Sequence, residues 1–121
     1  MRLSKQFRAL VTVSDYDRSV AFYRDVLGLD IFRSWDDPHG SGTVFHAAKG
    51  LIEVLTGEGS LDTPGLGAVA IEVENADEAH REIVARGASP GEPITAPWGH
   101  RLFHLDAPDG VRLIFFQELE A

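Results

Sequence analysis

The chain of 121 residues is 44% hydrophobic and 25% charged, which fits one globular domain and excludes disordered and fibrous classes. Nineteen acidic residues against eleven Lys plus Arg give a formal net charge of −8. Nucleic acids and anionic membranes require a basic surface, so this balance argues against both as partners. It favours a neutral or cationic small ligand.

Cysteine is absent, which excludes disulfides, thiolate catalysis and cysteine-ligated metal sites. Residues 1–6 contain no apolar signal-peptide run. No stretch of the chain approaches the roughly 20 apolar residues that a membrane span needs. We therefore expect a soluble, cytoplasmic protein.

The first half of the chain predicts a strand, a helix and three further strands. The apolar run 7–13 predicts the first strand, Asp15 or Asp17 is the candidate N-cap of the helix, and Gly28 ends that helix. The breaker-rich segment 36–42 predicts a flexible loop that could act as a lid. The remaining expectations are strands over 29–35, 43–48 and 51–56 and a linker over 57–65.

The second half repeats this pattern. Asn75 is the candidate N-cap of a second helix that ends at Gly87. The other expected elements are strands over 67–73, 100–105 and 111–117, a short strand within 90–97 and a turn over 108–110.

The two halves can be aligned at an offset of about 60 residues. Residues 13–15 match 73–75, and Gly28 matches Gly87. Each half has one helix to cover its sheet, so the other face must be covered by the sister half or by a ligand. We therefore expect an α+β fold of two βαβββ modules, forming paired curved mixed sheets around a shared cleft. The expected bounds are about 6–56 for module one, 57–65 for the linker and about 66–118 for module two.

Several motifs resemble the vicinal oxygen chelate superfamily, which includes glyoxalases, bleomycin-resistance proteins and extradiol dioxygenases. The resemblance rests on segments 13–15, 21–28, 97–101 and 106–111. It spans nearly the whole chain and implies the paired modules and a homodimer. Because this superfamily hosts several chemistries as well as plain binding, the resemblance does not itself decide the function.

The resemblance also implies where metal ligands would lie, on the first and last strands of each module. These positions carry Arg8, Glu53, Ala68 and Ile114, of which Glu53 alone can ligate a metal. One carboxylate cannot hold a divalent ion, and Arg8 would repel it. We predict no metal ligands, no catalytic residues and no cofactor. A divalent metal held by Glu53 with His46 and His104 is the alternative.

If Arg8 lies in the cleft, its guanidinium needs a partner, because burying an unpaired charge costs free energy. Glu53 is the obvious partner within the chain, an anionic group on a ligand is the second possibility, and exposure of Arg8 to solvent is the third. His46 and His104 lie on predicted strands and are candidate cleft residues. His80 is expected on the surface of its helix.

Apolar candidates complete the predicted ligand site. Trp35 and Trp98 are suited either to stacking on a planar ligand or to packing at a subunit contact. Ile114 and Phe116 share one side of the last strand and are placed in the cleft. The predicted ligand-binding set is Arg8, Glu53, His46, Trp35, Trp98, His104, Ile114 and Phe116.

The sequence thus predicts a metal-free binding protein similar to bleomycin-resistance proteins, which sequesters a drug or metabolite and so confers antibiotic resistance. The alternative is a glyoxalase-like lyase or isomerase, or an extradiol dioxygenase, that uses a divalent metal. A domain that only mediates protein assembly is a third reading. Its cleft would be filled by its own side chains.

Overall fold

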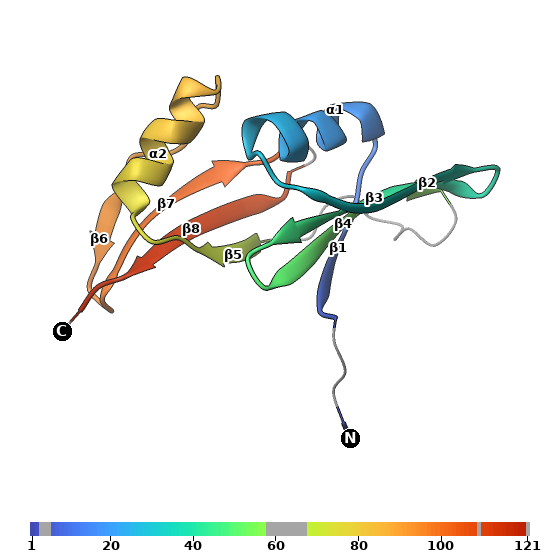
Figure 1. The fold of residues 1–121 in the computed structure, drawn as a ribbon. Coiled ribbons are helices and arrows are strands. Elements are labelled where there is room, and N and C mark those ends of the chain that lie inside the picture. The colour runs from blue at the N-terminus through green and yellow to red at the C-terminus, as the bar shows by residue number, and fades with distance from the viewer. Residues whose placement is uncertain (3–5, 58–67, 109, 121) are drawn as a thin grey trace.

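The computed structural model describes residues 1–2, 6–57, 68–108 and 110–120, and it contains two modules of the same architecture (Figure 1). Most of the predicted linker lies outside these described residues. The first module comprises β1 (Arg8–Thr12), α1 (Tyr16–Ala21), η1 (Phe22–Val26), β2 (Ile31–Asp37), β3 (Gly40–Ala47) and β4 (Gly50–Gly57). The second comprises β5 (Ala68–Glu72), α2 (Ala76–Ala85), β6 (Ile94–Ala96), β7 (His100–Asp106) and β8 (Arg112–Glu118).

Each module forms a four-stranded mixed sheet. The strand orders are β1-β4-β3-β2 and β5-β8-β7-β6. In both sheets the first strand pairs in parallel with the last one of its module, and the remaining pairs are antiparallel. The predicted α+β fold of two βαβββ modules is confirmed.

The helices begin where short polar side chains cap them. Asp15 accepts a hydrogen bond from the Arg18 amide, and Asn75 accepts one from the Glu78 amide. The first helix continues from α1 into η1, a wider helical turn closed by a bond from the Leu27 amide to the Phe22 carbonyl.

The predicted flexible loop over 36–42 is wrong, because the structure places a tight hairpin there. β2 continues to Asp37, which pairs with Gly40 at the start of β3. The carboxylate of Asp37 accepts a hydrogen bond from the His39 amide at 2.8 Å, and this bond stabilises the turn. Gly40 has a φ of +151°, in the region that favours glycine. This segment is therefore an ordinary strand connection and supplies no lid.

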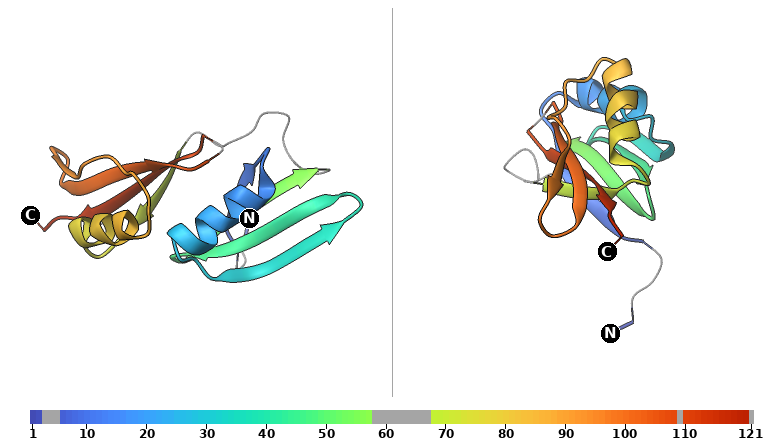
Figure 2. Two further views of the ribbon diagram at one scale, coloured as in Figure 1. Left: turned by 90° about the horizontal axis from the view of Figure 1, so that it is seen from above. Right: turned by 90° about the vertical axis from the view of Figure 1, so that its left-hand side faces the viewer.

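Both helices cover the same side of the two sheets (Figures 1 and 2). One continuous apolar core lies beneath them and draws on both modules, with Tyr23, Phe45, Phe103 and Leu113 nearly inaccessible to solvent. No helix of the described residues lies on the opposite side, which we call the helix-free face. Within the described part of the chain, β1 pairs with β4 alone and β5 with β8 alone, and the two edge strands line a common seam.

Candidate functional site

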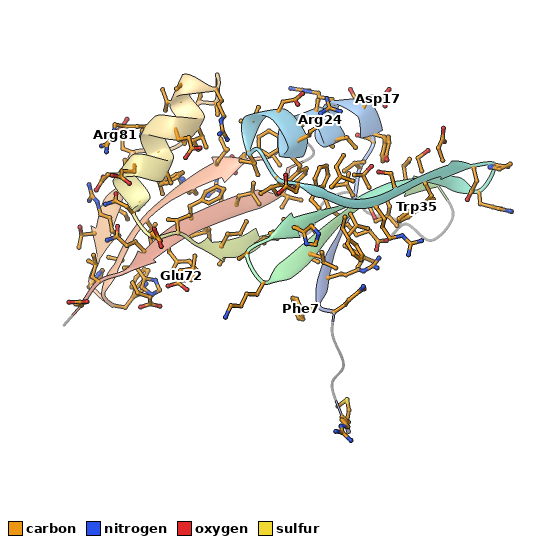
Figure 3. The ribbon with its side chains drawn as sticks, in the orientation of Figure 1. Phe7, Asp17, Arg24, Trp35, Glu72 and Arg81 are labelled. Atoms are coloured by element: carbon orange, nitrogen blue, oxygen red, sulfur yellow. The ribbon has the colours of Figure 1, made fainter. Side chains whose placement is uncertain are left out.

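Strand alternation places several of the predicted site residues on the helix-free face. In the first sheet, Phe45 and Ile52 point into the core, so His46 and Glu53 point to the other side. In the second sheet, Phe103 and Phe115 are core residues. The adjacent strand positions on the helix-free face are His104, Ile114 and Phe116. In Figure 3, Phe7, Trp35 and Glu72 lie on the side away from the helices, whereas Asp17, Arg24 and Arg81 lie on the helical side.

The strand registers show which residues of the two modules are equivalent. Leu10 lies opposite Glu53 in the β1–β4 pair, and Ala70 lies opposite Ile114 in the β5–β8 pair. Glu53 and Ile114 therefore occupy the same structural position. By the same reasoning, Arg8 of β1 corresponds to Ala68 of β5.

Arg8 and Glu53 form an ion pair on the helix-free face. Arg8 Nη1 donates to Glu53 Oε1 at 2.7 Å, and Arg8 Nε donates to Gln6 Oε1 at 3.0 Å. The two side chains are 23% and 11% exposed, so the carboxylate is the more deeply buried partner. Of the three possibilities for Arg8, the structure shows the partner within the chain.

Trp35 lies flat against its own sheet. A methyl group added at Gly42 would come within 2.1–2.5 Å of the Trp35 ring, so the indole occupies the space that a side chain would fill. The Arg33 guanidinium lies 5.9 Å from the indole centroid, in cation–π geometry. Trp35 thus covers the first sheet and is half-buried.

Trp98 belongs to a cluster at the far end of the second sheet. Its Nε1 donates to His100 Nδ1 at 3.1 Å, and His100 Nε2 lies 3.1 Å from the Glu118 carboxylate. The His100 ring stacks on Phe116 with a centroid distance of 4.8 Å. An indole N–H can only donate, so Nδ1 must be the acceptor and Nε2 carries the proton. Sequence reasoning missed His100, although its alternation with Leu102 and His104 could have placed it on this face.

His46 and His104 lie in different sheets. His46 is exposed and meets Phe32 edge to face at 5.2 Å. His104 is exposed and lies against Gly91, where an added methyl group would come within 2.6 Å of its ring. His80, expected on the surface, instead has a buried Nε2 and packs edge to face on Phe103 at 5.2 Å.

Two carboxylates of the second module are held by arginines. Hydrogen bonding to Arg112 lowers the pKa of Asp106, and hydrogen bonding to Arg101 lowers that of Asp77. Both carboxylates are exposed, so these pairs orient charge without sealing it from water. Asp106 and Arg112 border the helix-free face, whereas Asp77 belongs to α2.

Three of the predicted site residues line cavities, each a different one. Arg8 lines a cavity of about 460 Å³ at the seam between β1 and β5, with Phe7, Leu10, Ala68 and Ala70. His46 lines a separate cavity of about 190 Å³, also beside Phe7. A third cavity, of about 340 Å³, lies between the first helix and the end of β7 and includes His104. Phe7, Leu10 and Ala70 were not among the predicted site residues, and only their adjacency in the folded seam identifies them.

The residues present do not fit the metal centre that the resemblance implies. Glu53 already binds Arg8, and the equivalent positions Ala68 and Ile114 offer no donor atom. Nowhere among the described residues do three His, Asp or Glu side chains gather into a group that could hold a metal ion. We derive no chemical step through a metal.

Comparison with protein families now defines the class. Residues 5–115 match the model of the Glyoxalase/Bleomycin resistance protein/Dioxygenase superfamily. The chain therefore belongs to this superfamily, also called the vicinal oxygen chelate superfamily, and the resemblance found in the sequence is confirmed. A search of curated proteins gave no match.

Solved structures with this fold include proteins of different activity. TnmS3, an antibiotic binding protein from Streptomyces, is 22% identical with a TM-score of 0.81, over 98% of each chain. A superfamily member from Sphaerobacter thermophilus is 24% identical with a TM-score of 0.77, over 96% of this chain and 98% of that one. Lactoylglutathione lyase from Agrobacterium tumefaciens is 17% identical with a TM-score of 0.73, over 97% and 96%. At these identities the similarity establishes the fold alone.

None of the helices in the described part of the chain is both long and apolar enough to cross a bilayer.

Proposed function

We propose that this chain is a metal-free binding protein that sequesters a small drug or metabolite on its helix-free face. The single observation that carries the proposal is the Arg8–Glu53 ion pair. The one carboxylate at the expected ligand positions is engaged by a guanidinium at 2.7 Å. A divalent ion placed about 4 Å from that guanidinium would be opposed by roughly 8 kcal/mol at an effective dielectric near 20.

The surroundings of this pair suit binding. The seam cavity of about 460 Å³ is walled mainly by apolar side chains, with a guanidinium as its charged group. A few polar groups in an apolar concavity are typical of small-molecule sites. The antibiotic-binding activity named for TnmS3 supports the same class of function and makes antibiotic resistance a reasonable biological role.

Arg8 and Glu53 are the proposed polar centre of the ligand site. None of the other predicted residues lines the seam cavity, so we propose them as outer contacts that a larger ligand would reach across the helix-free face; they are His46, Trp35, Trp98, His104, Ile114 and Phe116. Phe7, Leu10 and Phe32 are exposed, and Phe7 lines one cavity with Leu10 and another with Phe32. Because a monomer seldom leaves a cluster of large apolar side chains uncovered, we also propose that the protein is a homodimer. A second copy would then help to enclose the ligand.

A thermal-shift screen of small molecules tests the proposal, run in parallel with and without a chelator. We expect hits that raise the melting temperature equally in both arms, because the site needs no ion. Each hit is then recovered and checked for chemical change, and light scattering on the same sample gives the mass. Stabilisation that disappears with the chelator, or conversion of the hit to a product, would support the metal-dependent lyase or dioxygenase instead.

A further inference from the structure

We infer that the seam cavity selects a neutral, largely apolar molecule carrying a carbonyl-type oxygen, and that Arg8 binds this oxygen. The inference rests on the proposed function and names its ligand class. Two observations support it. One is the volume of the seam cavity, and the other is the neutral net charge of the Arg8–Glu53 ion pair.

The room at the seam comes from a difference between equivalent strands. Arg8 and Leu10 of β1 face the cavity from one side, and the small side chains Ala68 and Ala70 face it from the other. Had β5 carried residues as large as those of β1, the space would be filled. An adjoining cavity of about 220 Å³ shares Phe7, Ala9, Val69 and Ala70 as lining residues, so the seam can take an elongated ligand.

The apolar walls require an apolar body. Phe7 stands at the mouth of both seam cavities with 79% of its surface exposed. An exposed aromatic ring beside a concavity gains free energy when a flat apolar molecule covers it.

The guanidinium of Arg8 has donors to spare. A guanidinium has five N–H groups, and within the described residues those of Arg8 bond to Glu53 through Nη1 and to Gln6 through Nε. Nη2 remains for a ligand that can accept. A ligand with no acceptor oxygen would cover these N–H groups and leave them unpaired, which is unfavourable.

The charge balance excludes ionic ligands. Glu53 neutralises Arg8, so a bound carboxylate would leave a net negative charge in an apolar cavity of a chain whose net charge is −8. A cation would meet the guanidinium first, because Glu53 is the more buried partner. A neutral oxygen avoids both penalties.

Four naphthalene probes of one shape test this inference by equilibrium dialysis in the presence of chelator. They are 2-acetylnaphthalene (a neutral ketone), 2-ethylnaphthalene (no acceptor), 2-naphthoate (an anion) and 2-naphthylmethylammonium (a cation). We expect the ketone to bind most tightly, about tenfold more tightly than the ethyl compound, which lacks the hydrogen bond to a charged donor.

Glu53→Gln is the decisive variant, because the amide oxygen still accepts from Arg8 while the neutralising charge is lost. We expect naphthoate to become the tightest probe, with a gain of about tenfold or more. Asp106→Asn is the matched control. It makes the same change in net charge beside Arg112, which does not line this cavity, and should leave the order of probes unchanged. Ala70→Leu fills the cavity and should abolish binding of all four.

Several outcomes would overturn the inference. They are a wild-type preference for naphthoate or the ammonium, an unchanged order in Glu53→Gln, an altered order in Asp106→Asn, undiminished binding in Ala70→Leu, and no binding of any probe. None of these outcomes shows metal-dependent binding or chemical conversion of a ligand. They would overturn the ligand class and leave the proposed function standing, because the thermal-shift screen tests that function separately.

Discussion

The two modules share one fold and one strand register, yet their helix-free faces differ. In the first module several positions of this face are buried. Val44, Glu53 and Leu55 are at most 9% exposed, although no helix among residues 6–57 and 68–108 covers this face. In the second module the equivalent face is open, since Ala68, Ala70, His104 and Arg112 are exposed.

The difference arises from side-chain size. In the first module the Trp35 indole packs over Gly42 and Arg8 extends to Glu53, so two large side chains occupy this face. The second module has Ala68 where the first has Arg8 and Ile114 where it has Glu53. The duplicated fold thus has a mostly buried face in one module and an open one in the other, and the seam cavity that Arg8 lines lies between them.

The largest loss of stability is expected when the Arg8–Glu53 ion pair of the first module is broken. Arg8→Met leaves a mostly buried carboxylate unpaired and should lower the free energy of unfolding by about 2–3 kcal/mol, measured by urea denaturation. Arg8→Met/Glu53→Leu removes both charges and should recover most of the loss. In the second module, Arg112→Met breaks the exposed pair with Asp106 and should lower the free energy of unfolding far less than Arg8→Met does. Similar losses for Arg8→Met and Arg112→Met would refute the contrast between the modules.

A smaller loss of stability is expected when a methyl group is added beneath the Trp35 ring in the first module or beneath the His104 ring in the second. Gly42→Ala forces the Trp35 indole off the first sheet and should cost about 1–2 kcal/mol, because the ring covers buried residues. Gly91→Ala meets the His104 ring, which is exposed and can rotate away, so its cost should stay within about 0.5 kcal/mol. Denaturation of the two variants under one condition gives the comparison, and a Gly91→Ala loss equal to or above that of Gly42→Ala would contradict it.

Most of the fold could be predicted from the sequence, because its signals are local. Asp15 and Asn75 cap their helices as expected, and the offset of about 60 residues between the halves identified the duplicated module. Segment 36–42 was misjudged because a Pro-His turn flanked by Asp and Gly has the composition of a loop. Strand pairing across that turn extends both strands into it, and composition does not reveal such pairing.

The site was only partly predictable. The resemblance placed Arg8, Glu53 and Ile114 in the cleft, and alternation along the last strand added Phe116. The pairing of Arg8 with Glu53 followed from the cost of a buried charge. Phe7 and Ala70 meet only because β1 and β5 share a seam, which depends on how the modules pack. The contact between Trp98 and His100 depends on side-chain conformation, which strand alternation does not specify.

The central claim is that a guanidinium stands where this superfamily would otherwise place a metal, and titration calorimetry tests it most directly. Chelator-treated wild-type protein is titrated with Zn²⁺, Ni²⁺, Mn²⁺ and, without oxygen, Fe²⁺. The Arg8–Glu53 pair predicts no saturable binding of any of them near one ion per chain. Tight binding of one ion per chain, lost on Glu53→Gln, would show that Glu53 is a metal ligand and would contradict the account.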